Sequence, residues 1–128
     1  MTFLVKDLER AADFFIAVFE ARQIYNSEDN PESHCRERFL MLNDLWICIM
    51  EGEPLVEQTY NHVAFKIPDE LYPVYEARIH ALGLERRPSR PRRKGEARSI
   101  YFYDYDNHLF ELHTGELEER MKYYLPQA

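Results

Sequence analysis

Hydrophobic and polar positions follow the same order twice along this chain. Residues 2–6 alternate in a stretch rich in β-forming residues, which predicts a strand. Asp7 then precedes a stretch, reaching to about Glu20, whose apolar residues recur every three or four positions. That spacing predicts an amphipathic helix with Asp7 as its N-cap. The apolar stripe of this helix consists of Leu8, Ala11, Ala12, Phe15, Val18 and Phe19.

Short β-rich runs follow the helix in the first half, and the whole order then starts again. The first half predicts three further strands, at residues 22–25, 36–42 and 45–50. Asn43 and Asp44 separate the last two strands and predict a tight hairpin turn. The second half predicts a strand at 60–67, a helix from about 69 to 82, and strands near 84–87, 99–104 and 108–113. Gly83 would end that helix, because glycine tolerates the left-handed conformation of a C-terminal cap.

Two internal alignments support this repeat. Residues 3–7 superpose on residues 65–69, and residues 45–52 line up with residues 108–115. We therefore expect an α+β fold built from paired βαβββ modules within one domain. The single domain spans residues 1–128. It contains module 1 at about 1–52, module 2 at about 58–113 and a C-terminal helix at about 115–124.

His62 and Glu111 provide the most informative chemistry. Alternation along each strand places both side chains on the inner face of the predicted sheet. An imidazole and a carboxylate together suit a divalent metal such as Mn, Fe, Co, Ni or Zn. The competing interpretation is a hydrogen-bonded core histidine and an exposed glutamate. His113 shares the face of Glu111, either as a hydrogen-bonding partner of a ligand or as a substitute ligand.

The repeat also predicts where a third ligand would lie. The counterpart of His62 in the first half falls one residue before Met1, so this ligand is absent from the chain as it stands. A start codon assigned too far downstream is the favoured explanation. The alternatives are a histidine supplied by an expression tag and a degenerate protein.

Three charged features each have two interpretations. Glu37 lies between Arg36 and Arg38, so it is either part of a solvated ion-pair face or a general base acting on water. Arg120, on the C-terminal helix, is either a surface charge or a bidentate clamp for an anion. The basic cluster at 86–94 is either a solvated loop or the rim of a site for a small anion.

Composition excludes several classes of function. A net charge of -7 and a pI near 5.2 argue against sequence-independent binding of nucleic acid. No apolar run approaches the roughly 20 residues that span a bilayer, and charges occupy the place of a signal-peptide core. Two cysteines form neither a disulfide framework nor a zinc knuckle, so we expect a cytoplasmic protein in a reducing environment.

Three long stretches carry a resemblance to a known family, namely residues 45–52, 59–62 and 98–113. The chain resembles the fosfomycin resistance proteins of the vicinal oxygen chelate (glyoxalase/bleomycin resistance) superfamily, most closely the fosfomycin-specific epoxide hydrolases. The resemblance implies a curved-sheet cup, a domain-swapped homodimer that shares each metal site, and Mn(II) as the ion. His62 and Glu111 map onto two ligands of that ion, and Glu37 maps onto the general base.

The resemblance also implies a substrate and a reaction. It assigns binding of the phosphonate group of fosfomycin to Thr2, Tyr60, Ser99, Tyr101 and Arg120, with residues 90–94 as an electropositive rim. Metal-dependent hydration of the epoxide would then give a vicinal diol. The alternatives are a thiol transferase that uses glutathione or bacillithiol, and a non-catalytic drug-binding module of the same fold.

Overall fold

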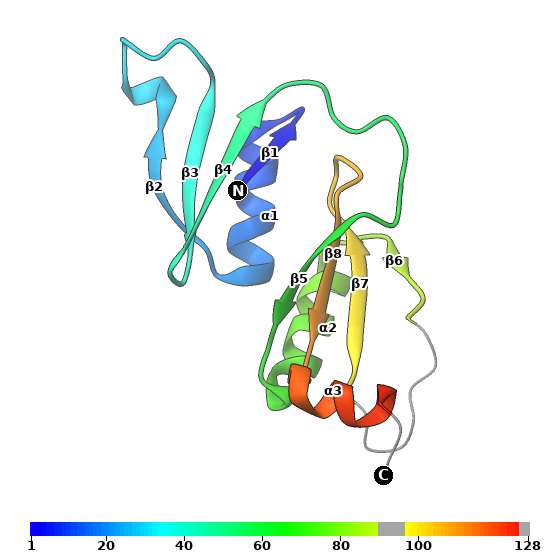
Figure 1. Ribbon diagram of the computed structural model, residues 1–128. Helices are drawn as coiled ribbons and strands as arrows, with labels where there is room; N and C mark the ends of the chain where they lie inside the picture. Colours follow the sequence, from blue (N-terminus) through cyan, green and yellow to red (C-terminus); the bar gives the residue numbers. More distant parts are fainter. Residues whose placement is uncertain (90–96, 126–128) are drawn as a thin grey trace. The chain divides into compact units, whose positions relative to one another are not determined.

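The computed structural model describes residues 1–89 and 97–125, which form two compact units (Figure 1). Unit 1 comprises Met1–Gln58 together with Asp104–His108, and unit 2 comprises Thr59–Tyr103 together with Leu109–Ala128. Each unit contains a four-stranded sheet with the same topology. The expected pairing of βαβββ modules is therefore confirmed. None of the described helices is long and apolar enough to cross a membrane.

Unit 1 places its strands in the order β1-β4-β3-β2. Strand β1 runs parallel to β4, whereas the other neighbours are antiparallel. The parallel pair needs a crossover, and α1 lies within it. The elements are β1 (Thr2–Val5), α1 (Leu8–Phe19), β2 (Arg22–Asn26), the 3-10 turn η1 (Ser27–Asp29), β3 (Glu37–Leu42) and β4 (Leu45–Glu51).

Helix α1 forms where the sequence predicts it, for identifiable local reasons. The Asp7 side chain accepts a hydrogen bond from the backbone N–H of Arg10 at 3.1 Å, and Glu20 ends the helix in the left-handed conformation. Every residue of the predicted apolar stripe is buried, and so is Phe14. Burying a side chain of that size stabilises the unit by roughly 2–3 kcal/mol.

Unit 2 repeats this arrangement with the strand order β5-β8-β7-β6. Strands β5 and β8 form the parallel pair. Figure 1 shows α2 lying behind this sheet, and the side chains of Ile100, Phe102, Phe110 and Leu112 are fully buried. The elements are β5 (His62–Lys66), the 3-10 turn η2 (Asp69–Leu71), α2 (Tyr72–Ala81), β6 (Arg86–Arg87), β7 (Ser99–Tyr103), β8 (Leu109–His113) and α3 (Leu117–Tyr124).

The strands and the C-terminal helix of unit 2 are one to three residues shorter than predicted, and two of its elements differ in a way that has a local cause. The expected helix at 69–82 consists of the turn η2 followed by α2, with a proline in the first turn of α2 where its missing N–H costs nothing. The expected strand at 84–87 shortens to two residues. The N–H of Leu84 donates to the carbonyl of Ile79 at 3.3 Å, so this residue still belongs to the helix cap around Gly83.

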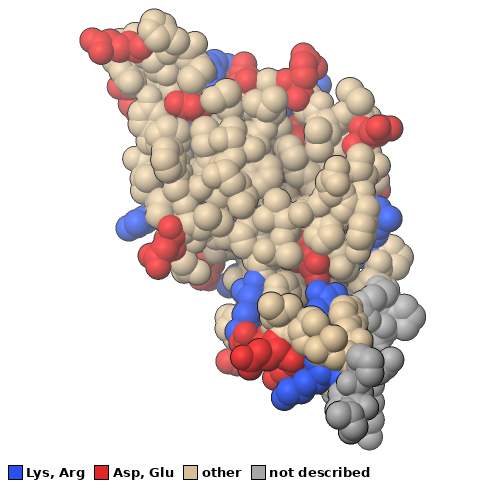
Figure 2. Space-filling model, in the orientation of Figure 1, with Lys and Arg blue, Asp and Glu red and all other residues tan. Residues whose placement is uncertain are grey.

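Figure 2 looks onto the face of the unit 2 sheet that lies away from α2, since it has the orientation of Figure 1. Residues other than Lys, Arg, Asp and Glu make up most of the surface in view over the strands, whereas acidic and basic residues lie next to one another near α3 (Figure 2). Strand alternation assigns this face the side chains of His62 and Glu111.

Candidate metal centre

His62 and Glu111 meet on neighbouring parallel strands. In the register of β5 and β8, His62 lies opposite Leu109 and Ala64 lies opposite Glu111. The Nε2 atom of His62 is 3.1 Å from Oε1 of Glu111. Glu111 is only 4% exposed, whereas the side chain of His62 is 21% exposed. The predicted pair is therefore brought together in the structure, and its histidine is accessible.

The other ring nitrogen of His62 determines what this pair can bind. Nδ1 lies 2.7 Å from the backbone carbonyl of Tyr60, and a carbonyl oxygen only accepts, so Nδ1 carries the hydrogen. In the neutral ring Nε2 then presents a lone pair towards the carboxylate of Glu111. Two ligand atoms facing one another need a cation or an additional proton between them. Neighbouring ligands around an octahedral ion with bonds of ~2.1 Å lie ~3 Å apart, so the pair fits a divalent metal.

Glu111 is held in its charged form by its neighbours. The Ser99 hydroxyl donates to Oε2 of Glu111 at 2.8 Å, and the Tyr101 hydroxyl also donates to this carboxylate. Burial by itself raises the pKa of Glu111, but the hydrogen bonds from Ser99 and Tyr101, together with the neighbouring His62 ring, outweigh it and lower the pKa below its usual value. A buried, fixed carboxylate of this kind is a suitable metal ligand.

Tyrosine hydroxyls border the pair on the same face. The Tyr60 hydroxyl donates to that of Tyr101 at 3.4 Å, and both rings pack against the ring of His62. Burial, the hydrogen bond with Tyr60 and the charge of Glu111 raise the pKa of Tyr101. Tyr101 therefore remains an O–H donor over the whole neutral range.

Glu37 lies in unit 1, on the face opposite to the arginines that flank it. Arg36 forms ion pairs with Glu28 at 2.9 Å and Glu51 at 2.7 Å, and no ion pair among the described residues includes Glu37. The Cys48 thiol donates to Oε2 of Glu37 at 3.6 Å. Arg36 thus pairs with other acids and Arg38 donates to the Gln23 amide at 3.3 Å, so the half-buried carboxylate of Glu37 is left with neutral partners.

Sequence reasoning missed the pairing of Cys48 with Glu37. Burial and the nearby carboxylate raise the pKa of the Cys48 thiol, so the sulfur keeps the proton that it donates. The signal that could have found it is the strand register, because Phe39 and Thr2 both lie opposite Cys48, and Glu37 shares the face of Phe39.

The register also supports the alignment of the two modules. Thr2 lies opposite Cys48 in unit 1, as Ala64 lies opposite Glu111 in unit 2. The ladder continues to the end of the chain, where the carbonyl of Met1 accepts from the N–H of Cys48 at 2.9 Å. No group of three metal-binding side chains gathers within residues 1–89 and 97–125, so a third ligand just before Met1 stays a prediction.

The remaining predicted residues have local partners or lie outside the described part. On α3, Nε of Arg120 donates to the Tyr124 hydroxyl at 3.1 Å, one helical turn away. His113 makes a hydrogen bond with the carbonyl of Gly115 at 3.2 Å. The predicted rim at residues 90–94 lies outside the described residues.

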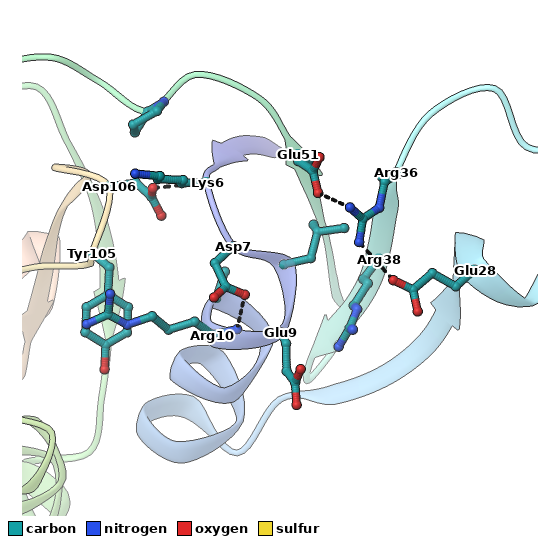
Figure 3. A pocket seen from close by; sticks show the side chains of 13 residues that line it. Lys6, Asp7, Glu9, Arg10, Glu28, Arg36, Arg38, Glu51, Tyr105 and Asp106 are labelled. Atoms are coloured by element: carbon teal, nitrogen blue, oxygen red, sulfur yellow. Dashed lines mark hydrogen bonds and ion pairs between the residues drawn. The ribbon is translucent and has the colours of Figure 1, made fainter.

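A cavity of about 590 Å³ in unit 1 does not coincide with the predicted site. It lies where α1 begins, and it is lined by acidic and basic side chains together (Figure 3). Arg36 reaches Glu28 and Glu51, while the guanidinium of Arg10 lies 3.7 Å from the centre of the Tyr105 ring. This mixture of balanced charges favours no single class of ligand.

Comparison with known proteins gives a consistent set of relatives, although no family model matches the chain. The fosfomycin resistance protein FosX of Listeria monocytogenes is 55% identical over 124 residues, covering 97% of this chain and 93% of that protein. The metallothiol transferase FosB of Bacillus licheniformis is 34% identical over 128 residues, covering 97% of this chain and 79% of that protein.

A solved structure agrees with the sequence comparison. A glutamate-to-glutamine mutant of FosX of Listeria monocytogenes in complex with Mn(II) and 1S,2S-dihydroxypropylphosphonic acid superposes with a TM-score of 0.88 at 55% identity, covering 94% of this chain and 93% of that chain. The agreement extends over both modules of the fold. The chain therefore belongs to the fosfomycin resistance protein FosX family of the vicinal oxygen chelate superfamily.

Proposed function

We propose that this protein confers resistance to fosfomycin by adding water to the epoxide of the drug. The diol bound in the related Listeria structure is the compound that such a hydration yields. Identity is 55% to FosX but 34% to the thiol transferase, which favours hydrolysis over thiol transfer. The observation that carries the proposal is the carboxylate of Glu37, which has no ion-pair partner among the described residues and lies on the predicted inner face.

His62 and Glu111 would hold a divalent ion, for which Mn(II) is the favoured choice. When bound, this ion supplies Lewis acidity towards the oxirane oxygen. We propose that two subunits of a homodimer share each site, with the third ligand coming from the first strand of the other subunit. The hydrogen bonds to Glu111 and the carbonyl that fixes the His62 ring keep both ligand atoms in place.

Glu37 would act as the general base. Its carboxylate takes a proton from water as the water oxygen forms a bond to an epoxide carbon, and the ring C–O bond breaks. The former ring oxygen ends as the second hydroxyl of the diol after it gains a proton. A positioned base of this kind contributes roughly 10²–10⁴ in rate. The hydrogen bond from Cys48 restrains the carboxylate and leaves lone pairs for water.

The phosphonate would be held by hydroxyl donors and a guanidinium, namely Thr2, Tyr60, Ser99, Tyr101 and Arg120. These donors fix the pose of the epoxide with respect to the base, which is an orientation effect. The hydroxyls of Ser99 and Tyr101 donate to Glu111 in the structure, so each would turn from that carboxylate to donate to the phosphonate.

The test compares the protein with its Glu37→Gln variant, both loaded with Mn(II) and given fosfomycin without any thiol. We expect the parent protein to form the diol, detected by ³¹P NMR, and the variant to lose roughly 10²–10⁴ in rate. Mn(II) affinity should be equal in both proteins, which controls for misfolding. A thiol adduct without diol would show a transferase, and stoichiometric drug binding without turnover would show a sequestering module.

We further propose that the two units act together as one domain and that the protein works in the cytoplasm. Cys35 is an exposed free thiol and Cys48 a buried one, as is typical of proteins from reducing compartments.

A further inference from the structure

We propose that Arg87 is a positioning residue for the phosphonate, which it serves by fixing the Tyr60 ring and by adding positive charge to the ligand-binding face. The inference rests on the proposed function, since it concerns the same substrate. Sequence reasoning placed Arg87 only within a general basic cluster. Three observations carry the assignment: strand register, contacts and, among the described residues, the absence of an ion pair between Arg87 and an acid.

The register separates Arg87 from its neighbour Arg86. On the edge strand β6, Arg87 lies opposite Tyr101 and Arg86 lies opposite Phe102. Paired residues of antiparallel strands share a face of the sheet, so Arg87 lies on the face of Tyr101 and Glu111. Arg86 lies on the other face, where its guanidinium pairs with Glu76 of α2 at 3.1 Å.

Arg87 contacts two tyrosines, Tyr60 of the candidate site and Tyr103 of β7. Its guanidinium carbon lies 4.8 Å from the centre of the Tyr60 ring, and Nη1 donates to the Tyr103 hydroxyl at 3.1 Å. Among the described residues no acid forms an ion pair with it. The guanidinium therefore keeps its full charge while two aromatic partners fix its place.

This placement links Arg87 to the metal pair through a series of contacts that runs over Tyr60 and Tyr101. Tyr60 precedes β5 and is 56% exposed, so the strand ladder does not restrain its ring. The Tyr60 hydroxyl donates to Tyr101, and Tyr101 in turn donates to Glu111. The guanidinium on the Tyr60 ring thus fixes the outermost donor of a hydrogen-bonded series that begins at Glu111.

The chemistry of the substrate explains why this charge matters. A phosphonate is an anion at neutral pH and is attracted by a nearby cation whose charge no acid cancels. Arg87 acts before and during binding, and it contacts neither the epoxide nor the metal ligands. Its loss should therefore weaken the binding of substrate more than it slows the chemical step.

The experiment measures steady-state kinetics with fosfomycin for the Mn(II)-loaded parent protein and for Arg87→Gln, Arg87→Lys and Arg86→Gln. We expect Arg87→Gln to raise KM about tenfold with kcat within about threefold. Arg87→Lys should recover part of KM, because it keeps the charge but loses the planar contact with the ring. Arg86→Gln is the matched control, since it removes the adjacent arginine from the opposite face, and its KM should change less than twofold.

A second measurement separates this inference from the proposed function. Calorimetric titration with inorganic phosphate reports anion binding without turnover, and Arg87→Gln should bind about tenfold more weakly than Arg86→Gln. If the parent protein makes no diol but this difference persists, the proposed reaction fails and the role of Arg87 stands. Equal KM values and equal phosphate affinities for the two variants would overturn the inference.

Discussion

Two carboxylates of this protein, Glu111 and Glu37, occupy environments that suit different tasks. Glu111 is buried and receives hydrogen bonds from Ser99 and Tyr101, which stabilise its charge for a cation. Glu37 is half-buried, and the thiol of Cys48 donates to it. Carboxylates with such different surroundings can divide the roles of ligand and base between them.

The contact between Cys48 and Glu37 leads to a prediction about rate. Cys48→Ala removes the thiol donor, so the carboxylate gains rotational freedom, and we expect kcat for fosfomycin to fall by roughly 3- to 10-fold. Cys48→Ser keeps a donor of similar size and should restore most of this loss. Steady-state kinetics at saturating Mn(II) provide the measurement. An Ala variant as fast as the parent would mean that the thiol does not position the base.

Single-residue roles could be predicted where they depend on the alternation of faces, and not where they depend on register. His62 and Glu111 share a face because each occupies an inward position on its own strand. The contacts of Cys48 with Glu37 and of Arg87 with Tyr60 require knowing which residues lie opposite one another across strands. Between β3 and β4 a local signal, the two-residue turn, does set the register, whereas the contact of Arg87 with Tyr60 depends on the packing of the whole sheet.

At the scale of elements, the loops after β4 and β8 offer a matched comparison. Gly52 and Gly115 are counterparts in the repeat. A Cβ added at Gly115 would lie 2.4 Å from Cβ of Ala97, whereas one added at Gly52 would come no closer than 3.4 Å to the flexible side chain of Leu4. Only the second module therefore needs glycine at this position for reasons of space.

We predict that Gly115→Ala lowers the free energy of unfolding by about 1–3 kcal/mol, because the methyl group overpacks the contact with Ala97. Ala97→Gly in the same chain should restore most of the loss by removing the opposing methyl group. Urea unfolding of the single and double variants tests both statements. Gly52→Ala is the control and should change stability by less than about 1 kcal/mol. Equal losses at the two glycines would contradict the packing argument.

The elements themselves followed from the sequence where their periodicity was strong. Helix α1 has an apolar stripe and a capping residue, and β3 and β4 are joined by a two-residue turn, so local signals determine them. The expected strand at 84–87 was too long, because the hydrogen bond of Leu84 to the end of α2 competes with strand pairing. A competition between two local structures cannot be decided from residue preferences alone.

At the scale of the molecule, the alignment of the two modules makes the position before Met1 open to experiment. The ladder between β1 and β4 already includes the carbonyl of Met1. A histidine added there would occupy the place that His62 has in the second module. We predict that this extension raises Mn(II) affinity by at least about tenfold, since it supplies a third ligand.

The measurement is a Mn(II) titration of the protein starting at Met1 and of versions extended by histidine or by alanine. The alanine version controls for the longer chain and the displaced amino terminus. Equal affinities for the two extensions would show that the inferred ligand position is wrong. The same titration with Glu111→Gln should lose the gain, because both residues would then belong to one site.

Cys48 and Glu111 occupy corresponding places in two copies of one architectural unit, and this has a consequence for how such proteins diversify. Because the fold contains two modules, a position can keep one chemical role in one module while its counterpart in the other module acquires a different role. In unit 2 the position carries a charged group suited to an ion, and in unit 1 it carries a neutral donor that serves a neighbouring acid. Internal duplication thus supplies spare positions, and the chemistry of the family can change by altering one copy at a time.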